Sequence, residues 1–368
     1  MDLMAVRDLF PVTKHAVFLN SAAESPLNTR VRQRLDQYLD LVSATPQRKP
    51  SVRSAVRRQL AALMGGDPDE YALVTSTGVG IGIVAAGLEL QPGDNVVVPV
   101  EEHWNNTFPW LALAERGVEV RLAPTEEDNS ISPERVAAMT DSRTKLIATA
   151  AVRFNSGFRT DLKRLSRIAH DVGALFLVDG IQASGVVPMN VDEDGIDILA
   201  CAGFKWLLGL PGTGFLYVRR QAQQLIKPAL PGMFAAEDNM RELRYWPDAR
   251  RYETGSIAYS LFHAWTAGLE LLQEVGVDNI YQRVLQLTDR LISGLQAARQ
   301  TIISPVNDIQ SRSGILLFSA GSPDENRQLY ERLQAQNIII TLRGGVCRVS
   351  PSFFNTEAEI DQFLNAIS

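Results

Sequence analysis

The chain has 368 residues, of which 45% are hydrophobic and 21% are charged, and its formal net charge is −6. These values are ordinary for a globular protein with a large core, and they exclude disordered, collagen-like and low-complexity classes. The mildly acidic balance speaks against a nucleic acid or an anionic membrane as partner.

Targeting and metal-binding signals are also missing from the sequence. No apolar run approaches the roughly 18 residues of a membrane span, and the start of the chain lacks the basic and apolar regions of a secretory signal. Cys201 and Cys347 are too few for a disulfide framework, and the four histidines stand at no metal-ligand spacing. We therefore expect a cytoplasmic protein without a membrane partner and without a metal site.

Two expected helices, 29–42 and 53–64, precede a region in which short β-branched runs alternate with helical patterns. Such alternation is typical of an α/β fold with a mostly parallel sheet that helices cover on both faces. Ser132 and Pro133 open a further helix as its N-cap and first helical residue. The other expected elements of this region are strands 71–75, 95–99, 118–122, 145–150, 175–178, 196–202 and 214–218, and helices 78–88, 106–115 and 162–170.

After about residue 255 the pattern changes to long helices and fewer strands, which predicts a smaller α+β domain. We expect a large domain over residues 16–258, a small C-terminal domain over 259–368, and an N-terminal segment, 1–15, that packs on the small domain. The elements expected in the small domain are helices 260–274, 279–299, 324–336 and 357–366, and strands 314–318, 338–342 and 346–349.

Positive charge gathers in one place in the sequence, at Arg48, Lys49, Arg53, Arg57 and Arg58. An acidic chain without aromatic residues between these charges is not typical of a nucleic-acid-binding patch. We therefore interpret the cluster as the solvated face of the helix over 53–64.

Lys205 stands inside an apolar, glycine-rich stretch that runs from Cys201 to Gly214. A desolvated lysine has a lowered pKa and becomes a nucleophile toward carbonyl groups. A lysine at the end of an apolar strand can equally extend its ammonium group into water. This stretch alone leaves both interpretations open.

Asp179 follows the apolar residues 175–178 and precedes a glycine. In open α/β sheets, ligands bind beyond the carboxyl ends of strands, where an acid can pair with a protonated ring nitrogen. The alternative is an aspartate that caps the next turn. Lys205 follows 26 positions later, which leaves room for one excursion and one strand and can place both residues at the same sheet edge. A Schiff-base lysine and an aspartate for a pyridinium nitrogen are what pyridoxal phosphate needs.

Small residues fill the junction of an expected strand and helix, Thr75 to Gly80. Backbone N–H groups at a helix N-terminus favour a phosphate. A rival interpretation is a dinucleotide fingerprint, because Gly80, Gly82 and Ala85 match G-x-G-x-x-A and Glu101 lies about 20 residues further on. These glycines fall a turn too deep into the helix, so we favour the phosphate site and keep an NAD- or FAD-dependent oxidoreductase as an alternative.

With these motifs, the chain resembles the class V aminotransferase family of fold-type I pyridoxal-phosphate enzymes. That group includes cysteine desulfurases, cyst(e)ine C–S lyases and isopenicillin N epimerase-like proteins. The resemblance extends from Phe18–Ala23 to Arg348–Thr356. It implies a large domain with a mostly parallel sheet of the seven-stranded type, a smaller α+β domain, pyridoxal 5'-phosphate as cofactor, and a homodimer with active sites at its interface.

The resemblance also implies roles for single residues. Lys205 would form the Schiff base and move protons, Asp179 would keep the pyridine nitrogen protonated, and Gln182 would reach the phenolic oxygen of the cofactor. Trp104 would stack on the cofactor ring. The phosphate would be held by Ser76, Thr77, Gly78 and Val79 and, from the neighbouring subunit, by the loop that contains Gly255 and Ser256.

For the substrate, the resemblance assigns the α-carboxylate to Arg348. Arg343, near the same strand end, is a candidate for the substrate's other end, and Asn106 is a candidate for the side-chain pocket. A guanidinium group suits a carboxylate because it donates two parallel hydrogen bonds.

The chain departs from cysteine desulfurases at two places. Those enzymes have Ser-Gly-His-Lys at the Schiff-base site, where this chain has Ala202–Lys205 with phenylalanine in the histidine position. They also carry a persulfide-forming cysteine on a mobile loop before the final arginine, and residues 338–348 leave no room for such a loop. We interpret Cys347 and Cys201 as buried structural cysteines.

We therefore expect an enzyme that acts on a small α-amino acid, with Lys205 removing the α-proton. It would be a class V aminotransferase or a β-(C–S) lyase without a persulfide cysteine. The alternatives are an epimerase of the isopenicillin N type, the oxidoreductase that uses the glycines around Gly80, and a non-catalytic protein that retains the fold.

Overall fold

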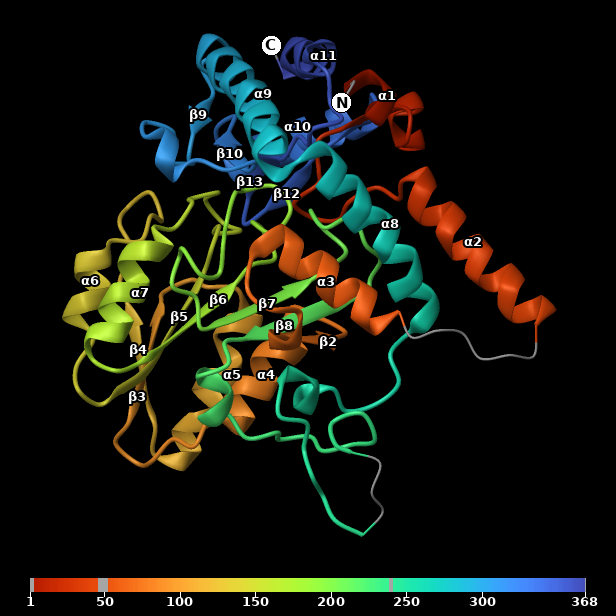
Figure 1. Ribbon diagram of the computed structural model, residues 1–368. Helices are drawn as coiled ribbons and strands as arrows, with labels where there is room; N and C mark the ends of the chain where they lie inside the picture. The colour runs from red at the N-terminus through yellow and green to blue at the C-terminus, as the bar shows by residue number, and fades with distance from the viewer. Residues whose placement is uncertain (1–2, 46–51, 238–240, 368) are drawn as a thin grey trace.

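A seven-stranded sheet forms the centre of the computed structural model, which describes residues 3–45, 52–237 and 241–367 (Figure 1). Its strand order is β2-β8-β7-β6-β5-β3-β4, and β8 runs antiparallel to both of its neighbours while the other pairs are parallel. This confirms the expected α/β class. The strands are β2 (Tyr71–Val74), β3 (Asn95–Pro99), β4 (Glu119–Ala123), β5 (Thr144–Ala150), β6 (Leu175–Asp179), β7 (Ile198–Ala202) and β8 (Gly214–Val218).

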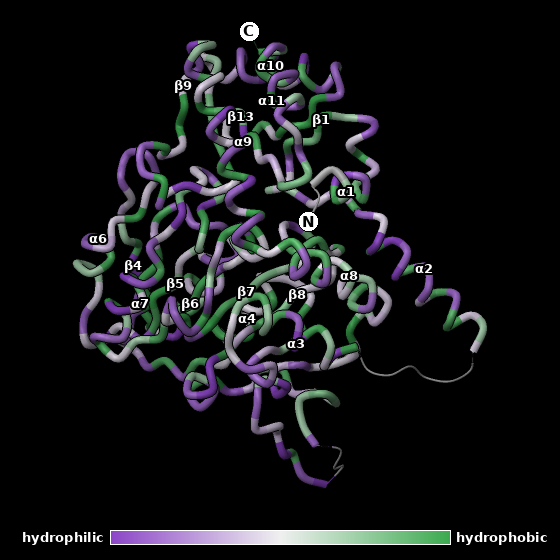
Figure 2. Tube along the Cα trace, turned by 45° about the horizontal axis from the view of Figure 1, so that its top comes forward, coloured by the Kyte–Doolittle hydropathy of each residue, from purple (hydrophilic) through white to green (hydrophobic). Residues whose placement is uncertain are grey.

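Helices cover both faces of this sheet, as the alternating pattern predicts. Successive side chains of a strand point to opposite faces, so Phe176 and Val178 of β6 pack in one hydrophobic cluster and Leu177 packs in another. Figure 2 shows these central strands as a mainly hydrophobic trace inside a more hydrophilic outer layer. The helices of the two faces are α3 (Arg53–Met64), α6 (Pro133–Ala138) and α7 (Leu162–Asp171) on the first and α4 (Thr77–Gly87) and α5 (Phe108–Leu111) on the second.

The C-terminal part of the chain forms a second, antiparallel sheet of order β12-β13-β10-β9, at the top of Figure 1. Its apolar face is covered by three helices, whose leucine, isoleucine and phenylalanine side chains form one buried cluster with the strands. The elements are α9 (Val277–Ala297), β9 (Thr301–Ile302), β10 (Leu316–Ser319), α10 (Pro323–Ala335), β12 (Thr341–Arg343), β13 (Val346–Val349) and α11 (Glu357–Ile367).

The N-terminal segment lies against this C-terminal part. After α1 (Leu3–Arg7), the ring of Phe10 stacks on Phe354 with 4.2 Å between centroids, and Arg7 pairs with Glu359 at 2.8 Å. β1 (Val17–Phe18) then pairs in parallel with β11 (Ile338–Ile339). Asn20 and Ser21 then contact Ser350, so the segment that packs on the small domain continues past the boundary at residue 15 that we expect from the sequence.

Two long helices connect the two parts of the molecule. α2 (Thr29–Ala44) lies along α8 (Tyr259–Val275), and α8 also packs against α3, so that α8 touches the large sheet's helical layer before α9 leads into the small domain (Figure 1). Within the described ranges, no helix has the length and apolar character that crossing a membrane requires.

Two expected elements are divided in the structure. The helix expected over 106–115 is broken into short pieces, because Thr107 has non-helical backbone angles and Pro109, which lacks an N–H group, starts a new turn. The strand expected over 338–342 is two strands, β11 and β12, that pair in different sheets.

The basic cluster is not a solvated face at two of its positions. Arg53 and Arg57 are buried in α3 and both pair with Glu253, while Arg58 is exposed. Arg48 and Lys49 lie outside the described residues. The expectation is wrong for Arg53 and Arg57 because their carboxylate partner lies about 200 positions away, where no local pattern reveals it.

Candidate active site

Lys205 is partly buried just after β7 and makes no hydrogen bond or ion pair with any described residue. Burial lowers the pKa of its ammonium group to about 8, and the positive charge of Arg348 adds to this effect while Asp179 opposes it. A desolvated amine whose pKa lies near neutrality is a competent nucleophile and base. The structure therefore favours the desolvated lysine over the one that reaches into water.

A tight loop fixes the backbone around Lys205. The Gly203 N–H donates to the Thr213 carbonyl at 2.8 Å, and a Cβ at Gly203 would come within 2.5 Å of the Thr213 hydroxyl. Leu208 adopts a left-handed conformation (φ 59°) that closes the turn, and Trp265 donates its ring N–H to the Leu207 carbonyl at 2.9 Å.

Asp179 is buried at the carboxyl end of β6, two strands away from β8. Its Oδ1 accepts a hydrogen bond from the Ile181 N–H at 3.0 Å, so the turn-capping contact is present. Burial nevertheless raises the pKa of this carboxyl to about 7, and the charge of Glu102 raises it further, while Lys205 lowers it. A cationic ring nitrogen beside Asp179 would stabilise the ionised form.

Glu102 and Arg153 form a buried pair behind Asp179. The Glu102 Oε1 accepts from the Ala150 N–H at 3.1 Å and from Arg153 at 3.4 Å, and Ala150 is the residue of β5 that pairs with Asp179. Burial raises the pKa of Glu102, whereas Arg153 lowers it. Sequence reasoning missed Glu102, whose only signal is a charge directly after an apolar strand.

The start of α4 lies beside β7, close to the Lys205 loop. Ser76 is the N-cap of α4 and accepts from the Val79 N–H at 3.2 Å, and the Thr77 hydroxyl accepts from the Ala202 N–H at 2.9 Å. A Cβ at Gly78 would lie 3.0 Å from Asn105. The structure thus brings Ser76, Thr77, Gly78 and Val79 to the strand end that carries Lys205, as a phosphate site requires.

The glycines of the dinucleotide interpretation have a different role. Gly80 and Gly82 lie inside α4 rather than in the turn before it, and a Cβ at Gly80 would come within 3.2 Å of the Ala200 Cβ. Gly80 therefore allows the helix to approach the sheet closely.

Gln182 is hydrogen-bonded through both the nitrogen and the oxygen of its amide. Its amide donates to the Ala22 carbonyl and accepts from the Trp206 ring N–H, both at 3.0 Å. One amide N–H is left over, and its predicted bond to the cofactor's phenolic oxygen stays a prediction.

The rings of His103, Trp104 and Phe154 lie near Arg343, and His103 also lies near Lys205. The ring of His103 lies 5.4 Å from that of Phe154, and the Arg343 guanidinium lies 4.5 Å from the Phe154 centroid and 5.8 Å from that of Trp104. Burial, together with the charges of Lys205 and Arg343, lowers the pKa of His103 to about 4. Trp104 is 56% exposed.

These contacts bear on the choice of Trp104 as the stacking residue, which stays a prediction. His103 is close enough to Lys205 that the charge of the lysine lowers the pKa of the imidazole. This position favours His103 over Trp104 as the ring that would cover a cofactor. The two residues are adjacent in sequence, and only the turn at the end of β3, where Glu101 has a positive φ of 56°, decides which one faces inward.

Arg348 is 1% exposed, and its Nε and Nη1 find no hydrogen-bond partner among the described residues. It lies on β13 of the small domain, and burial lowers its pKa to about 10. Asn106, by contrast, is buried with its Oδ1 3.4 Å from the Trp110 ring nitrogen that donates to it. Its Nδ2 finds no hydrogen-bond partner among the described residues, and its predicted contact with substrate stays a prediction.

Gly255 and Ser256 lie in the segment before α8. Arg53 donates to the Gly255 carbonyl at 2.9 Å, and a Cβ at Gly255 would meet open space. Their predicted role toward a neighbouring subunit stays a prediction, because a single chain is described.

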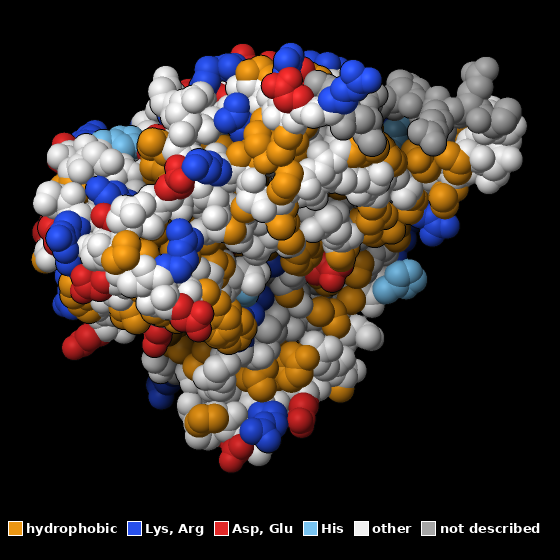
Figure 3. Space-filling model, turned by 90° about the horizontal axis from the view of Figure 1, so that it is seen from below, with side chains coloured by type: hydrophobic (Ala, Val, Ile, Leu, Met, Phe, Trp, Pro, Cys, Tyr) orange, Lys and Arg blue, Asp and Glu red, His pale blue; other side chains and the backbone are white. Residues whose placement is uncertain are grey.

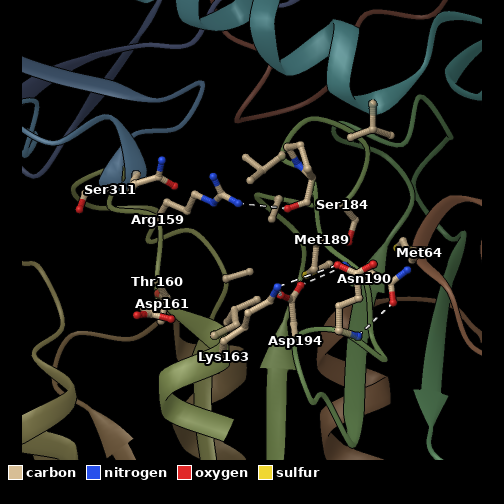
Figure 4. A pocket seen from close by; sticks show the side chains of 18 of the residues that line it. Met64, Arg159, Thr160, Asp161, Lys163, Ser184, Met189, Asn190, Asp194 and Ser311 are labelled. Carbon is tan, nitrogen blue, oxygen red and sulfur yellow. Dashed lines mark hydrogen bonds and ion pairs between the residues drawn. The ribbon is translucent and has the colours of Figure 1, made fainter. Parts of the chain in front are cut away.

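A cavity of about 750 Å³ lies elsewhere, beside α7 and the segment 183–194 (Figure 4). Arg159, Lys163 and Asp194 are among its lining residues, and charges of both signs are mixed there. None of the predicted site residues lines it.

The residues around Lys205 fit pyridoxal phosphate. A buried amine, a buried carboxyl group at a neighbouring strand end and a helix N-terminus meet at one edge of the sheet, while Arg348 presents unsatisfied N–H groups. The amine suits a carbonyl carbon, the carboxyl a ring nitrogen and the helix start a phosphate.

Comparisons with known proteins agree with this fit. A family model described as aminotransferase class-V matches residues 17–363. A probable cysteine desulfurase of Methanothermobacter thermautotrophicus is 28% identical, with 96% of this chain and 94% of that protein covered. An uncharacterized aminotransferase, YcbU, of Bacillus subtilis is 29% identical, with 98% and 96% covered.

Solved structures show the same fold. The apo cysteine desulfurase of Thermococcus onnurineus NA1 has a TM-score of 0.89 at 22% identity, with 98% of this chain and 96% of that chain covered. A cystine C–S lyase in complex with its product, cysteine persulfide, has a TM-score of 0.90 at 21% identity, with 97% and 98% covered. The oxidoreductase alternative is therefore set aside, and the chain belongs to the aminotransferase class-V family of pyridoxal-phosphate-dependent enzymes.

Proposed function

We propose that the protein binds a small α-amino acid, removes its α-proton with Lys205, and completes either β-elimination or amino-group transfer. The observation that carries this proposal is Arg348, a buried guanidinium with two unpartnered nitrogens. A buried charge without a partner is costly, and a carboxylate would satisfy it with two parallel hydrogen bonds. An α-amino acid supplies that carboxylate next to the amino group that reacts.

The arrangement of the site suggests a separate role for the cofactor and for each of Lys205, Asp179 and Arg348. Pyridoxal phosphate, when bound, supplies an electron sink for the negative charge that develops on Cα. Lys205 has a pKa of about 8, so a useful fraction of neutral amine is available to accept the α-proton. Asp179 places a carboxyl group for the ring nitrogen, and Arg348 fixes the substrate's carboxylate.

Neither cysteine of the chain is placed to carry a persulfide. Cys347 is fully buried in β13, where burial raises the pKa of its thiol to about 11, and Cys201 is buried in β7 with its pKa raised as well. Persulfide formation needs an accessible thiolate. This supports a β-(C–S) lyase or an aminotransferase without a persulfide cysteine, with epimerisation as the third outcome.

Arg343 is the candidate for the substrate's other end. It packs over the Phe154 ring and has no carboxylate partner within the described residues. Burial lowers its pKa. A substrate whose side chain is polar or negatively charged would supply the missing partner.

We also propose a homodimer. Val79, Trp104, Phe108 and Leu111 are all more than 40% exposed, on adjacent elements beside the site. Figure 3 shows hydrophobic side chains gathered on the underside of the molecule. Exposed apolar side chains that gather on one face are typical of an interaction surface. Sedimentation of the purified protein at a dimer's mass supports this proposal, and a monomer at micromolar concentration contradicts it.

The first experiment is the visible absorption spectrum of the purified protein with added pyridoxal phosphate, before and after borohydride, beside Lys205→Ala. A band that borohydride abolishes, and that the variant lacks or shifts, supports the proposal. The absence of any band overturns it.

The reaction type follows from product assays. Pyruvate and ammonia released from cystine or β-chloroalanine indicate β-elimination, whereas a new amino acid formed from a 2-oxo acid indicates transfer. Exchange of the α-proton with inversion and no other product indicates epimerisation.

A further inference from the structure

Glu253 is the centre of a buried ion cluster, which we call the Arg53–Glu253–Arg57 cluster. Its carboxylate is 2% exposed and binds Arg53 through Oε2 and Arg57 through Oε1, the latter at 2.5 Å. Arg53 and Arg57 stand one helical turn apart on α3, so both point to the same side of the helix. The guanidinium of Arg53 also lies 4.2 Å from the centroid of the Phe234 ring.

This cluster ties together three segments that are far apart in sequence. The Glu253 Oε1 also accepts a hydrogen bond from the Leu73 N–H of β2 at 2.9 Å, and Arg53 donates to the Gly255 carbonyl at 2.9 Å. One carboxylate therefore joins α3, β2 and the segment over 253–255.

Two of these segments lead directly to expected phosphate contacts. β2 ends at Val74, two residues before Ser76, the N-cap of α4. Gly255 is bound by the cluster and is followed by Ser256. The cluster thus positions the strand that delivers Ser76–Val79 to the phosphate of its own subunit. It also positions the loop whose Gly255 and Ser256 are expected at the phosphate of the neighbouring subunit.

We infer that the Arg53–Glu253–Arg57 cluster is a positioning device for the phosphate of the cofactor, so that its loss weakens cofactor binding. This inference rests on the proposed function. When a flexible loop binds a ligand, it loses conformational entropy, and this loss weakens binding. A loop that the fold already holds in place loses little entropy on binding.

The test uses the Glu253→Gln variant, which keeps the size of the side chain and removes its charge. The matched control is Glu270→Gln, because Glu270 pairs with Arg34 of α2 at 2.8 Å on the surface. Both apo-proteins are titrated with pyridoxal phosphate, and the visible band reports binding. Unfolding of both apo-proteins by urea is measured separately, because a buried ion pair also contributes to stability.

The expected result is that Glu253→Gln weakens cofactor affinity by about tenfold or more, as loss of a supporting contact does at other binding sites, while Glu270→Gln leaves it unchanged. An excess of cofactor then restores the band in Glu253→Gln. Unchanged affinity in a Glu253→Gln protein that is less stable to urea overturns the inference, because the cluster is then purely structural.

If Glu253→Gln does not fold, Arg57→Lys replaces it, because this change keeps the charge and shortens the reach toward Glu253. Unchanged cofactor affinity in Arg57→Lys likewise overturns the inference. A failure of the proposed function looks different, since the natural protein then shows no visible band at any cofactor concentration.

Discussion

Two groups of buried arginines behave differently in this molecule. Arg53 and Arg57 are each 7% exposed and share the carboxylate of Glu253, whereas Arg348 is 1% exposed and leaves two nitrogens without partners. Burial is similar, and Arg57 also leaves its Nε without a hydrogen bond. The difference is that Arg53 and Arg57 meet a carboxylate of the chain (the closed group), whereas Arg348 meets none among the described residues and is open to a ligand (the open group). A buried arginine that has a carboxylate partner within the chain stabilises the fold, whereas one without such a partner is suited to bind an anionic ligand. The presence of the partner, and not the degree of burial, distinguishes the two.

Lys205 likewise has no carboxylate partner within hydrogen-bond distance among the described residues, so we place it with Arg348 in the open group. Its removal has the largest expected effect. We expect Lys205→Ala to lower the rate of α-proton exchange by about 10⁴-fold or more, because the variant loses both the nucleophile and the base. The apo-protein should be no less stable, since a desolvated amine is removed. A variant that retains a tenth of the natural exchange rate, measured by NMR in D₂O, would contradict the assignment.

For the closed group, Arg53 and Arg57, we expect removal of the partner carboxylate to lower the stability of the apo-protein. Glu253→Leu leaves two arginines without their carboxylate, and we expect the free energy of unfolding to fall by about 3–5 kcal/mol. Urea denaturation of the apo-protein measures the change. A loss below about 1 kcal/mol would mean that water or another group replaces Glu253, and the contrast between the two arginine groups would then disappear.

Arg348→Leu tests the open group directly. Each charge-assisted hydrogen bond contributes about 1.5–3 kcal/mol and Arg348 would donate two, so we expect the KM for the amino acid to rise by about 100-fold or more. The free energy of unfolding of the apo-protein should stay the same or increase, because an unpaired buried charge is removed. If the Arg348→Leu apo-protein is less stable and its KM is unchanged, Arg348 has a structural role like that of Arg53 and Arg57.

The two titratable groups of the open site should give the apo-protein opposite pH dependences of stability. Asp179 has a pKa of about 7 in the fold instead of 3.8, so the folded state binds more protons between these values and stability falls as pH rises from 4 to 7. Lys205 has a pKa of about 8 instead of 10.5, so the unfolded state binds more protons and stability rises from pH 8 to 10.5.

Urea midpoints measured across this range, with Asp179→Asn and Lys205→Met alongside, assign each slope to its residue. Each variant should flatten only its own part of the curve. If both slopes persist in both variants, other groups cause them.

The smallest effect belongs to an exposed pair. Arg34 and Glu270 join α2 to α8 at 2.8 Å, with side chains 30% and 40% exposed. We expect Arg34→Ala to change the free energy of unfolding by about 0.2–1 kcal/mol, because water solvates both charges when the pair is broken. If the change is as large as that of Glu253→Leu, the contribution of these ion pairs to stability does not depend on their solvent exposure.

The sequence predicted the fold well where local patterns decide. The strands 95–99, 214–218 and 346–349 and the helix 53–64 have the expected bounds, and Ser132 is the N-cap of its helix as expected. The break of the helix expected over 106–115 was missed, because an apolar periodic pattern outweighed Pro109 in the prediction.

The candidate site was predicted in part. Asp179 and Lys205 stand out because each places a charge in an apolar context, and the structure brings both to one edge of the sheet. Trp104 was chosen as the stacking ring, whereas the structure places the adjacent His103 nearer to Lys205, and the predicted contact of Asn106 with substrate stays a prediction. These choices depend on the direction of side chains in turns, which residue type alone does not indicate.

The sequence by itself determined the alternation of strands and helices, the helix caps and the chemistry-bearing residues, since these depend on neighbours within a few positions of the chain. The tertiary structure alone decided which arginine meets a carboxylate, which ring faces Lys205 and where β1 pairs. Such contacts join residues up to several hundred positions apart, and they exist only once packing has brought the segments together.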